Sequence, residues 1–464
     1  MKRLLFYLIL LLAADCSFKN KNESRIRPYN QNPRYWQYKG DPVLLLGASD
    51  DDNLFQFRDL EKQLDLLKSA GGNYIRNTMS SRDTGNVWPF YQDPDGRYDL
   101  EKWDEEYWSR FNELLKLADE RDIIIQIEIW DRFDFSRDPW KVNPFNPANN
   151  VNYSSDISHL EFEYPEHPSA DVQPFFHTIP GMPLYKPGSE IIKKFQEKFV
   201  DKILSFTLEH GNILYCMDNE TNTPPAWGKY WMKYIREKAG KHEVYATDMF
   251  DEFYKPQSCP TCLAAISNPD EYHFLDVSQI NSRNFGQSHW DTLWWILNKR
   301  EEYELRPVNC TKVYGGGLSG FGSGSNTDGV ERFYRNVMGG IAAVRHHRPP
   351  TGNGLNEKAI ATIKTIRKVE SLSRFWEIEP RMELPAGREE NEAYISGNER
   401  NYVIYFPKGG SISIPTIEIN GCSLKWIDAG SSNWADEMKL EAAGTFVITT
   451  PDTVGSWFAV ITKR

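Results

Sequence analysis

Residues 213–220 carry an apolar run directly into two carboxylates and an amide. The letters ILYCM are followed by Asp218, Asn219 and Glu220. Carboxyl groups at the end of a buried strand can act as general acid and general base. Acids and asparagine are also common where a solvated turn begins. Period-two alternation places Asp218 and Glu220 on one face, whereas Asn219 points elsewhere or leaves the strand to bond a substrate hydroxyl.

Other apolar runs also contain or end in polar side chains. In IIIQIEIW, residues 123–130, the isoleucines take one face, which leaves Glu128 and Trp130 to line the interior of a barrel. Arg76 follows another run, and a buried arginine needs a carboxylate partner. The run 244–250 contains Asp248 and is followed by Asp251. The remaining candidates for binding substrate are Asp50, Asn281, His289, Lys312 and His346. Such acids and amides suit a neutral polyhydroxylated ligand, with an indole to stack on its ring.

Eight apolar runs alternate with helical patterns and would position these side chains. The predicted strands are 43–48, 73–79, 123–130, 213–217, 244–250, 273–280, 306–315 and 339–347. Eight strand–helix units predict an α/β fold of the closed (β/α)₈ type, a TIM barrel, whose active site lies at the carboxyl ends of the strands. The competing open doubly wound sheet usually has a glycine-rich phosphate turn after its first strand. Here that strand ends in the letters GASDDD, whose acids would repel a phosphate.

The domain boundaries follow from a change of period. We expect a signal peptide in residues 1–16, a linker in 17–35, and the barrel in 36–380. Residues 381–464 show period-two alternation and predict a small antiparallel β-sandwich. Inside the barrel, residues 131–190 form a long loop rich in proline and aromatic residues, which we expect to be an ordered wall of the cleft.

The first residues predict export. Lys2 and Arg3 precede an apolar run at 4–14 that is too short to span a bilayer, as in a secretory signal. Cys16 resembles a lipoprotein cleavage site, although Asp15 departs from that pattern. The expected location is secreted, periplasmic or anchored to the outer membrane of a bacterium, with a lipid on Cys16 as the sole membrane contact. The C-x-x-C at 259–262 predicts a disulfide that staples a loop, with a redox role as the alternative.

Composition excludes some partners. The net charge of −11 argues against nucleic acid, whose phosphates need a basic surface. No cofactor is expected, because the glycine-rich segment 315–325 lacks a phosphate-binding G-K-S/T signature. No metal is expected either. Two adjacent histidines at 346–347 face opposite sides of a strand, and the acids at 50–52 lack the spacing of a calcium loop. We expect these acids to cap a helix and Asp50 or Asn53 to make one contact with substrate.

GGNYIRN at 71–77 and MDNE at 217–220 resemble the (β/α)₈ glycoside hydrolases of clan A. In that clan an arginine on strand 2 supports the nucleophile, and an Asn-Glu pair ends strand 4 with its glutamate as general acid/base. The resemblance assigns these roles to Arg76, Asn219 and Glu220. The segment 34–57 and the tail 401–461 are similar to apiosidase-like secreted hydrolases, in which a β domain follows the barrel.

Strand 7 departs from the clan's pattern. Thr311 and Lys312 stand where the clan has its nucleophilic glutamate. Hydrolysis of a glycosidic bond needs two carboxyl groups, so the partner of Glu220 must come from another strand. The candidates for this second carboxyl group are Glu128, Asp218, Asp248 and Asp50. Lys312 either holds a neighbouring acid ionised or marks the loss of the original chemistry.

Two main functions are therefore compatible with the sequence. The first is an exported glycoside hydrolase that cleaves O-glycosidic bonds of a polysaccharide or oligosaccharide, with Glu220 as general acid/base. The alternative is a non-catalytic glycan-binding protein on a degenerate hydrolase barrel. A third class is structural, in which the β domain joins a surface complex. The sequence names neither the sugar nor the oligomeric state.

Overall fold

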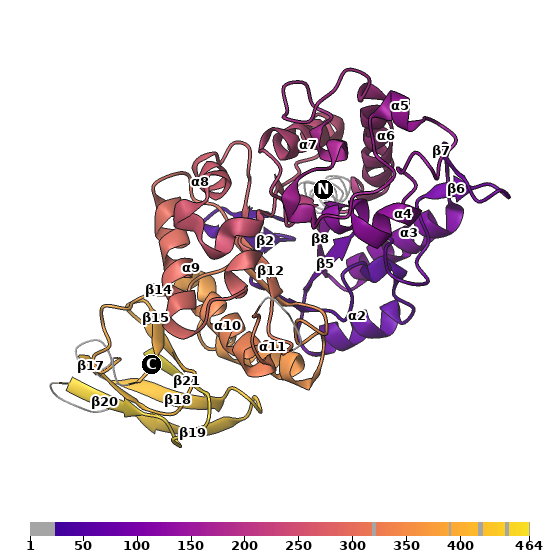
Figure 1. Ribbon diagram of the computed structural model, residues 1–464. Coiled ribbons are helices and arrows are strands. Elements are labelled where there is room, and N and C mark those ends of the chain that lie inside the picture. Colours follow the sequence, from indigo (N-terminus) through magenta and orange to yellow (C-terminus); the bar gives the residue numbers. More distant parts are fainter. Residues whose placement is uncertain (1–23, 318–321, 389–390, 416–420, 441–444, 464) are drawn as a thin grey trace, which may run out of the picture.

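The computed structural model describes residues 24–317, 322–388, 391–415, 421–440 and 445–463. The signal peptide and Cys16 lie outside the described residues. A large α/β barrel forms most of the molecule, and a smaller β domain (orange to yellow) lies at its side (Figure 1). Within the described ranges, no helix has the length and apolar character needed to cross a membrane.

The barrel sheet is built from eight parallel strands. They are β4 (Leu45–Ala48), β5 (Tyr74–Thr78), β8 (Ile124–Asp131), β9 (Ile213–Asn219), β10 (Ala246–Thr247), β11 (Leu275–Asp276), β12 (Val308–Val313) and β13 (Ala343–His346). Their order, β10-β9-β8-β5-β4-β13-β12-β11, is the chain order taken round a ring. The His273 backbone N–H donates to the Ala246 carbonyl at 3.0 Å and brings the two edges together. The predicted barrel is confirmed.

Strands β10 and β11 are shorter than predicted. Each ends after two residues, and the chain turns into the 3₁₀ helices η5 (Asp251–Tyr254) and η7 (Ser278–Asn281) soon afterwards. Both predicted runs, 244–250 and 273–280, are rich in apolar residues because the turns are also buried. Apolar letters alone do not separate a buried strand from a buried turn.

Helices cover the outside of the barrel. They are α2 (Leu60–Ser69), α3 (Glu105–Glu120), α6 (Glu190–Thr207), α7 (Ala226–Ala239), α8 (Pro260–Ser267), α9 (Gly286–Glu301), α10 (Asn326–Met338) and α11 (Glu357–Glu370). In α6, Ile192, Phe195, Phe199 and Ile203 recur at helical spacing and are buried on one face. The expected disulfide between Cys259 and Cys262 is present at the start of α8.

The long insertion between β8 and α6 is ordered, as predicted. It contains η2 (Arg132–Phe135), α4 (Arg137–Val142), α5 (Ser155–Ser158), η3 (Pro168–Ala170) and η4 (Pro174–His177). Phe135 and Phe175 stack with ring centroids 4.0 Å apart. Asn146 donates to the carbonyls of Trp140 and Phe162, both at 3.0 Å, so its amide satisfies backbone groups that have no strand partner.

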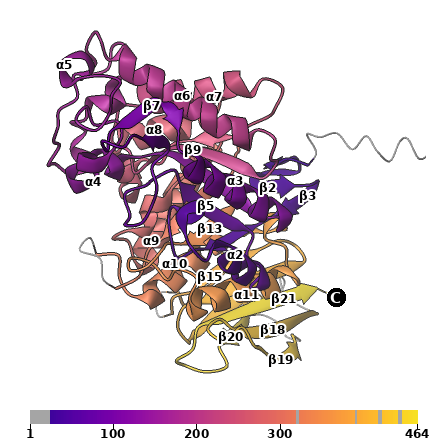
Figure 2. The same ribbon diagram turned by 90° about the vertical axis from the view of Figure 1, so that its right-hand side faces the viewer.

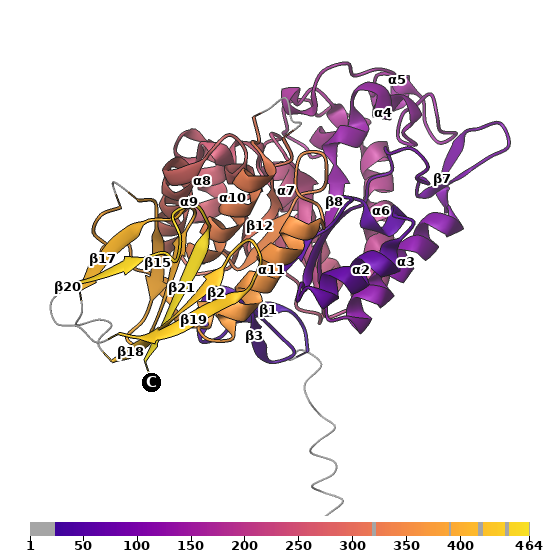
Figure 3. The same cartoon turned by 90° about the horizontal axis from the view of Figure 1, so that it is seen from below.

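A three-stranded antiparallel sheet closes the amino-terminal end of the barrel. It consists of β1 (Arg27–Tyr29), β2 (Asn32–Tyr38) and β3 (Asp41–Val43), seen from below in Figure 3. Trp36 is fully buried, and its indole N–H donates to Asn309 at 2.9 Å. Within the segment 17–35 expected as a linker, residues 27–29 and 32–35 therefore belong to a sheet, and Tyr35 is buried against the base of the barrel.

The β domain contains two antiparallel sheets, which confirms the predicted β domain. The strands are β14 (Glu379–Pro380), β15 (Tyr394–Gly397), β16 (Asn401–Phe406), β17 (Ser411–Pro415), β18 (Cys422–Asp428), β19 (Trp434–Lys439), β20 (Thr445–Thr449) and β21 (Trp457–Lys463). One sheet has the order β14-β15-β16-β21-β18-β19, and β17 pairs with β20. Figure 2 shows this domain at the end of the molecule away from α6 and α7.

Alternation along β16 explains how the domain is held. Tyr405 joins the barrel core, and its ring lies 5.1 Å from that of Tyr334 on α10. Ile404 and Phe406 belong instead to the separate core of the β domain. The Tyr334 hydroxyl also donates to the Ala429 carbonyl at 2.7 Å. The domain thus packs directly on the barrel helices.

Candidate active site

A cavity of about 420 Å³ opens at the carboxyl ends of the barrel strands. Its lining comes from the segments after all eight strands: Asp52, Arg82, Phe133, His167, Ser169, Asn219, Glu220, Asp251, Tyr254, Gln279, Ser282, Arg283, Lys312, Tyr314, His347, Arg348 and Thr351. This is the end at which (β/α)₈ enzymes carry their active sites. Its volume is in the range of small-molecule sites.

Glu220 forms an ion pair in this cavity. The Lys312 ammonium lies 2.6 Å from Glu220 Oε1, and the Tyr314 hydroxyl donates to the same oxygen at 2.9 Å. Lys312 also donates to the Asn219 side-chain oxygen. Within the described part of the chain, Glu220 Oε2 has no hydrogen-bond partner. The carboxylate therefore keeps one oxygen available for a ligand or water.

The backbone at Glu220 explains why two consecutive side chains line the cavity. Its φ of 57° is in the left-handed region, which a non-glycine residue rarely adopts. This turn ends the alternation of β9, so that Asn219 and Glu220 both line the cavity. Asn219 is the last residue of β9, so its side chain reaches the cavity without leaving the strand. Asp218 lies outside the lining, and the expectation that Asp218 and Glu220 share one face is therefore wrong.

The charge state of Glu220 follows from these contacts. Burial alone would raise the pKa of Glu220, but the positive charge of Lys312 and the hydrogen bonds from Lys312 and Tyr314 outweigh it and lower this pKa below its usual value. Glu220 is therefore ionised at neutral pH. An ionised carboxylate can accept a proton but has none to give.

Asp52 and Asp251 also line this cavity, but Asp52 is paired with Arg76 and Arg348, so Asp251 is the acid available beside Glu220. Thr221 pairs with Phe250 between the extended ends of β9 and β10, and the Asp251 N–H donates to the Thr221 carbonyl at 3.1 Å. Glu220 precedes the paired Thr221, and Asp251 follows the paired Phe250. Burial, followed by the negative charge of Glu220, raises the pKa of Asp251 to about 6. The two acids thus hold different charge states over part of the pH range.

Arg76 and Glu128 lie beneath the cavity. Two guanidinium nitrogens of Arg76 donate to the two oxygens of Glu128, both at 2.5 Å, and Arg76 also pairs with Asp52. All three side chains are almost completely buried. Arg76 therefore has the expected carboxylate partner, and it has two of them, Glu128 and Asp52. Glu128 is not among the residues that line the cavity.

Asp218 and Asp248 form a buried acidic pair away from the cavity lining. Asp248 Oδ1 accepts from the backbone N–H groups of Asp218 and Met249, both at 3.0 Å. A Cβ added to Gly228 of α7 would lie 2.2 Å from Asp248 Oδ2, so this carboxyl group faces the helix. Burial raises the pKa of Asp248 to about 7, and burial together with the charge of Asp248 raises the pKa of Asp218 well above its usual value.

The structure corrects the orientation expected for Trp130. Its ring lies 5.2 Å from Phe199 of α6 and 6.3 and 5.7 Å from Trp227 and Trp231 of α7. The indole is thus buried between the sheet and the helices, where several aromatic rings surround it, and does not face the barrel interior. Among the described residues, the rings that line the cavity include Phe133, Tyr254 and Tyr314.

Four other predicted substrate contacts are also placed outside the cavity lining. The Asn281 amide donates to the Lys312 carbonyl at 3.1 Å, and a ring nitrogen of His289 lies 3.0 Å from the Asn281 side-chain oxygen. His346 stacks on Phe333 at 4.5 Å. Asp50 accepts from the Gln63 amide at 2.8 Å and the Leu355 N–H at 2.7 Å. These side chains hold the framework around the site.

Sequence reasoning did not single out several residues that line the cavity. Arg82, Tyr314 and Arg348 come one to four residues after the ends of β5, β12 and β13. Their nearness to strand ends could have marked them as candidates for the site. Periodicity ends with the strand, however, and does not show which residue of the following loop turns inward.

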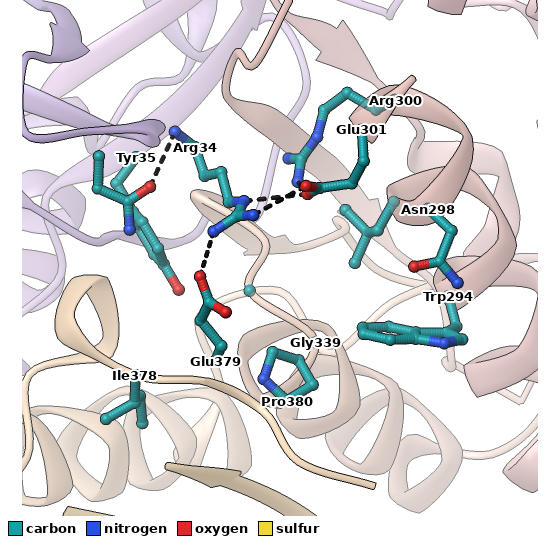
Figure 4. Close-up of a pocket in the computed structure, with 13 residues that line it drawn as sticks. Arg34, Tyr35, Trp294, Asn298, Arg300, Glu301, Gly339, Ile378, Glu379 and Pro380 are labelled. Atoms are coloured by element: carbon teal, nitrogen blue, oxygen red, sulfur yellow. Dashed lines mark hydrogen bonds and ion pairs between the residues drawn. The ribbon is translucent and has the colours of Figure 1, made fainter. Parts of the chain in front are cut away.

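A second cavity, of about 220 Å³, lies at the amino-terminal end of the barrel between β2, α9 and β14 (Figure 4). Arg34 donates to both oxygens of Glu301, at 3.0 and 2.8 Å, and pairs with Glu379. Arg300 also pairs with Glu301 at 2.9 Å, so two guanidinium groups share the two carboxylates. This arrangement joins the N-terminal sheet, the barrel and the β domain.

Comparisons with known proteins find likeness at the level of fold. No family model and no curated protein sequence matches the chain. A glycoside hydrolase family 5 structure from Bacteroides vulgatus is similar with a TM-score of 0.64 and 13% identity, over 95% of this chain and 94% of that one. A glycoside hydrolase gives 0.62 and 12%, over 95% and 97%. An alpha-amylase from Anoxybacillus gives 0.55 and 11%, over 96% and 99%.

Proposed function

We propose that this protein is a glycoside hydrolase that uses Glu220 and Asp251 as its pair of carboxyl groups. The observation that carries the proposal is that two acids with opposite pKa shifts line one cavity at the carboxyl ends of neighbouring strands. Glycoside hydrolysis needs one acid that gives a proton and one carboxylate that attacks or activates water. The likeness in fold to solved glycoside hydrolases supports a glycan as the substrate.

The charge states assign the two roles. Asp251 donates its proton to the leaving glycosidic oxygen, and Glu220 takes a proton from the water that attacks the anomeric carbon. The C–O bond to the leaving sugar breaks as the new C–O bond to water forms. The sequence predicts that Glu220 supplies the proton as general acid. Its ion pair with Lys312 instead favours the role of general base.

The roles assigned to the two residues correspond to inversion at the anomeric carbon. A carboxylate that activates water, rather than attacking the sugar itself, gives an inverted product. Glu220 and Asp251 come from the ends of the neighbouring strands β9 and β10.

A glycan-binding protein without hydrolysis is the second candidate. The specific observation in its favour is Lys312, which pairs with Glu220 from the strand that bears the nucleophilic glutamate in the clan that the sequence resembles. In this function, Asn219 and Glu220 would accept hydrogen bonds from sugar hydroxyl groups, and Tyr254 would stack on a ring.

Export to an oxidising compartment remains part of the proposal. Its support is the signal-like start of the chain together with the disulfide between Cys259 and Cys262, since such bonds persist mainly outside the cytosol. Mass spectrometry of the mature N-terminus would show whether Cys16 is the first residue and carries lipid.

The test is release of reducing ends from a panel of polysaccharides and oligosaccharides. We expect wild type to cleave at least one glycan, and Glu220→Gln and Asp251→Asn to lose about 10³-fold or more of that activity while still binding it. Glu304→Gln, at an exposed position outside the cavity, is the matched control and should keep full activity. Binding of a glycan by wild type without cleavage would favour the second candidate, and unchanged cleavage by Glu220→Gln would overturn the proposed roles.

A further inference from the structure

The cavity wall is richer in cations than the chain as a whole. Four residues that line it are arginine or lysine, namely Arg82, Arg283, Lys312 and Arg348. Three residues of the lining carry carboxyl groups, Asp52, Glu220 and Asp251. The whole chain has a net charge of −11, so four cationic side chains on one cavity wall depart from the overall composition.

Arg283 differs from the other three cations. Lys312 pairs with Glu220 at 2.6 Å, Arg348 with Asp52 at 2.8 Å, and Arg82 with two acids of the β8 end. Arg283 is exposed and has no carboxylate within ion-pair distance among the residues that the structure describes. Its charge is available to a ligand.

The position of Arg283 is fixed by its neighbours. Its guanidinium carbon lies 4.7 Å from the centre of the Tyr254 ring, which also lines the cavity. The next residue, Asn284, donates from its side chain to the Tyr254 carbonyl at 3.1 Å and accepts from Arg332 at 2.9 Å. Arg283 itself has a φ of 68°, in the left-handed region. A non-glycine residue held in this conformation is often part of a functional site.

The strand-8 side of the cavity has an excess of positive charge as well. Asp52 faces the guanidinium groups of Arg76, Arg345 and Arg348, the second at 3.8 Å. Glu128 neutralises Arg76. Three guanidinium groups thus share two carboxylates, and Arg348 is the one of the three that lines the cavity.

We propose that the ligand of this cavity is an anionic glycan, and that Arg283 binds a carboxylate or sulfate group of one sugar unit. The inference rests on the proposed function of the same site and names its substrate class. A planar guanidinium group can hold a carboxylate or sulfate through two parallel hydrogen bonds. The Tyr254 ring beneath it restricts its plane, and Arg348, which follows β13, adds positive potential two strands away in the barrel.

The test measures binding to matched charged and neutral probes by titration calorimetry. The full chain with Asp251→Asn is used so that no probe is consumed and Lys312 stays paired with Glu220. One pair is tetragalacturonic acid and its fully methyl-esterified form, which separates carboxylate from uncharged sugar. The other is a κ-carrageenan tetrasaccharide and a neutral agarose tetrasaccharide, which does the same for sulfate. We expect one charged probe to bind about tenfold or more tightly than its neutral counterpart.

Arginine variants then locate the charge that is responsible. Arg283→Gln should lower affinity for the charged probe about tenfold and leave the neutral probe unaffected. Arg58→Gln, an exposed arginine outside the cavity, should change neither. Equal or absent binding of charged and neutral probes, or a preference that survives Arg283→Gln, would overturn the inference.

The same experiment separates this inference from the proposed function. Charge-selective binding by a protein whose wild type cleaves none of the probes would sustain the anionic ligand and contradict hydrolysis. Cleavage of neutral glycans without any preference for charge would contradict the anionic ligand and sustain hydrolysis.

Discussion

The Lys312 ammonium lies 2.6 Å from the Glu220 carboxylate, which joins the ends of β12 and β9 across the cavity. A second carboxylate in place of this lysine would repel the charge on Glu220 and keep it protonated. The lysine has the opposite effect and keeps Glu220 ionised. The proton for a leaving group must then come from another acid, and Asp251 is the acid in the cavity whose pKa is raised.

Lys312→Met should raise the pKa of Glu220. Burial raises this pKa and the ammonium group lowers it, so the effect of burial is less offset once the ammonium group is removed. The acidic limb of the profile of kcat/KM against pH should move to higher pH, because a base must be deprotonated to act. Lys312→Arg keeps the charge and should leave the limb near its original position. A limb that stays in place in Lys312→Met would show that Lys312 does not control Glu220.

Wild-type activity should fall as the pH rises through about 6. Asp251 has a pKa of about 6 and must be protonated to act as the acid. Above this pKa, kcat/KM should decrease about tenfold for each pH unit. The measurement is initial rate at low substrate concentration from pH 4 to 9. A constant kcat/KM up to pH 8 would exclude Asp251 as the group that gives the proton.

Much of the fold could be predicted from the sequence because strands and helices have different periods. The apolar run at 213–217 becomes β9, and the helical spacing around Phe195 becomes α6. Strand β19, Trp434–Lys439, is not apparent from the sequence, since the letters WADEMK lack apolar alternation. Edge strands with charged side chains are common in natural sheets. Such a strand lacks the apolar alternation by which strands are recognised in a sequence.

The candidate site could be predicted only as far as the ends of the strands. Glu220, Asn219 and Lys312 belong to or adjoin regular strands, and all three line the cavity. Trp130 lies at the end of β8, where alternation placed it inside the barrel, yet its indole packs against helices. Side-chain direction at strand ends depends on local turns such as the one at Glu220, which periodicity does not encode.

Arg76→Met should destabilise the protein strongly. The change leaves Glu128 and Asp52 buried without their shared guanidinium partner. Loss of one partner from a buried ion pair costs about 3–5 kcal/mol, which for a chain of this size lowers the Tm by roughly 5–10 °C. Differential scanning calorimetry of the barrel transition measures the shift. The double variant Arg76→Met/Glu128→Gln should recover part of it. A single variant with unchanged Tm would contradict the structural role of this pair.

Asp248→Asn should make the protein more stable at neutral pH. The pKa of Asp248 is raised to about 7 in the folded state, above its value of about 3.9 in an unfolded chain. The folded state therefore binds more protons, and wild-type stability decreases as pH rises from about 4 through about 7. Asparagine can still accept from the backbone N–H groups of Asp218 and Met249.

Thermal unfolding at pH 4.5 and pH 7.5 measures this effect. We expect Asp248→Asn to unfold at a higher Tm than wild type at pH 7.5, and to differ less at pH 4.5, where Asp248 is protonated. Equal shifts at both pH values would show that the acid is not the source of the pH dependence.

The central claim is the division of roles between Asp251 and Glu220, and leaving-group dependence tests it most directly. A dinitrophenyl glycoside of the cleaved sugar needs no proton to depart, whereas the natural glycan does. Asp251→Asn should therefore hydrolyse the dinitrophenyl glycoside at close to the wild-type rate, yet lose about 10³-fold or more on the natural glycan. Glu220→Gln should be inactive on both substrates. The opposite pattern, in which the good leaving group rescues Glu220→Gln but not Asp251→Asn, would contradict the account and make Glu220 the acid.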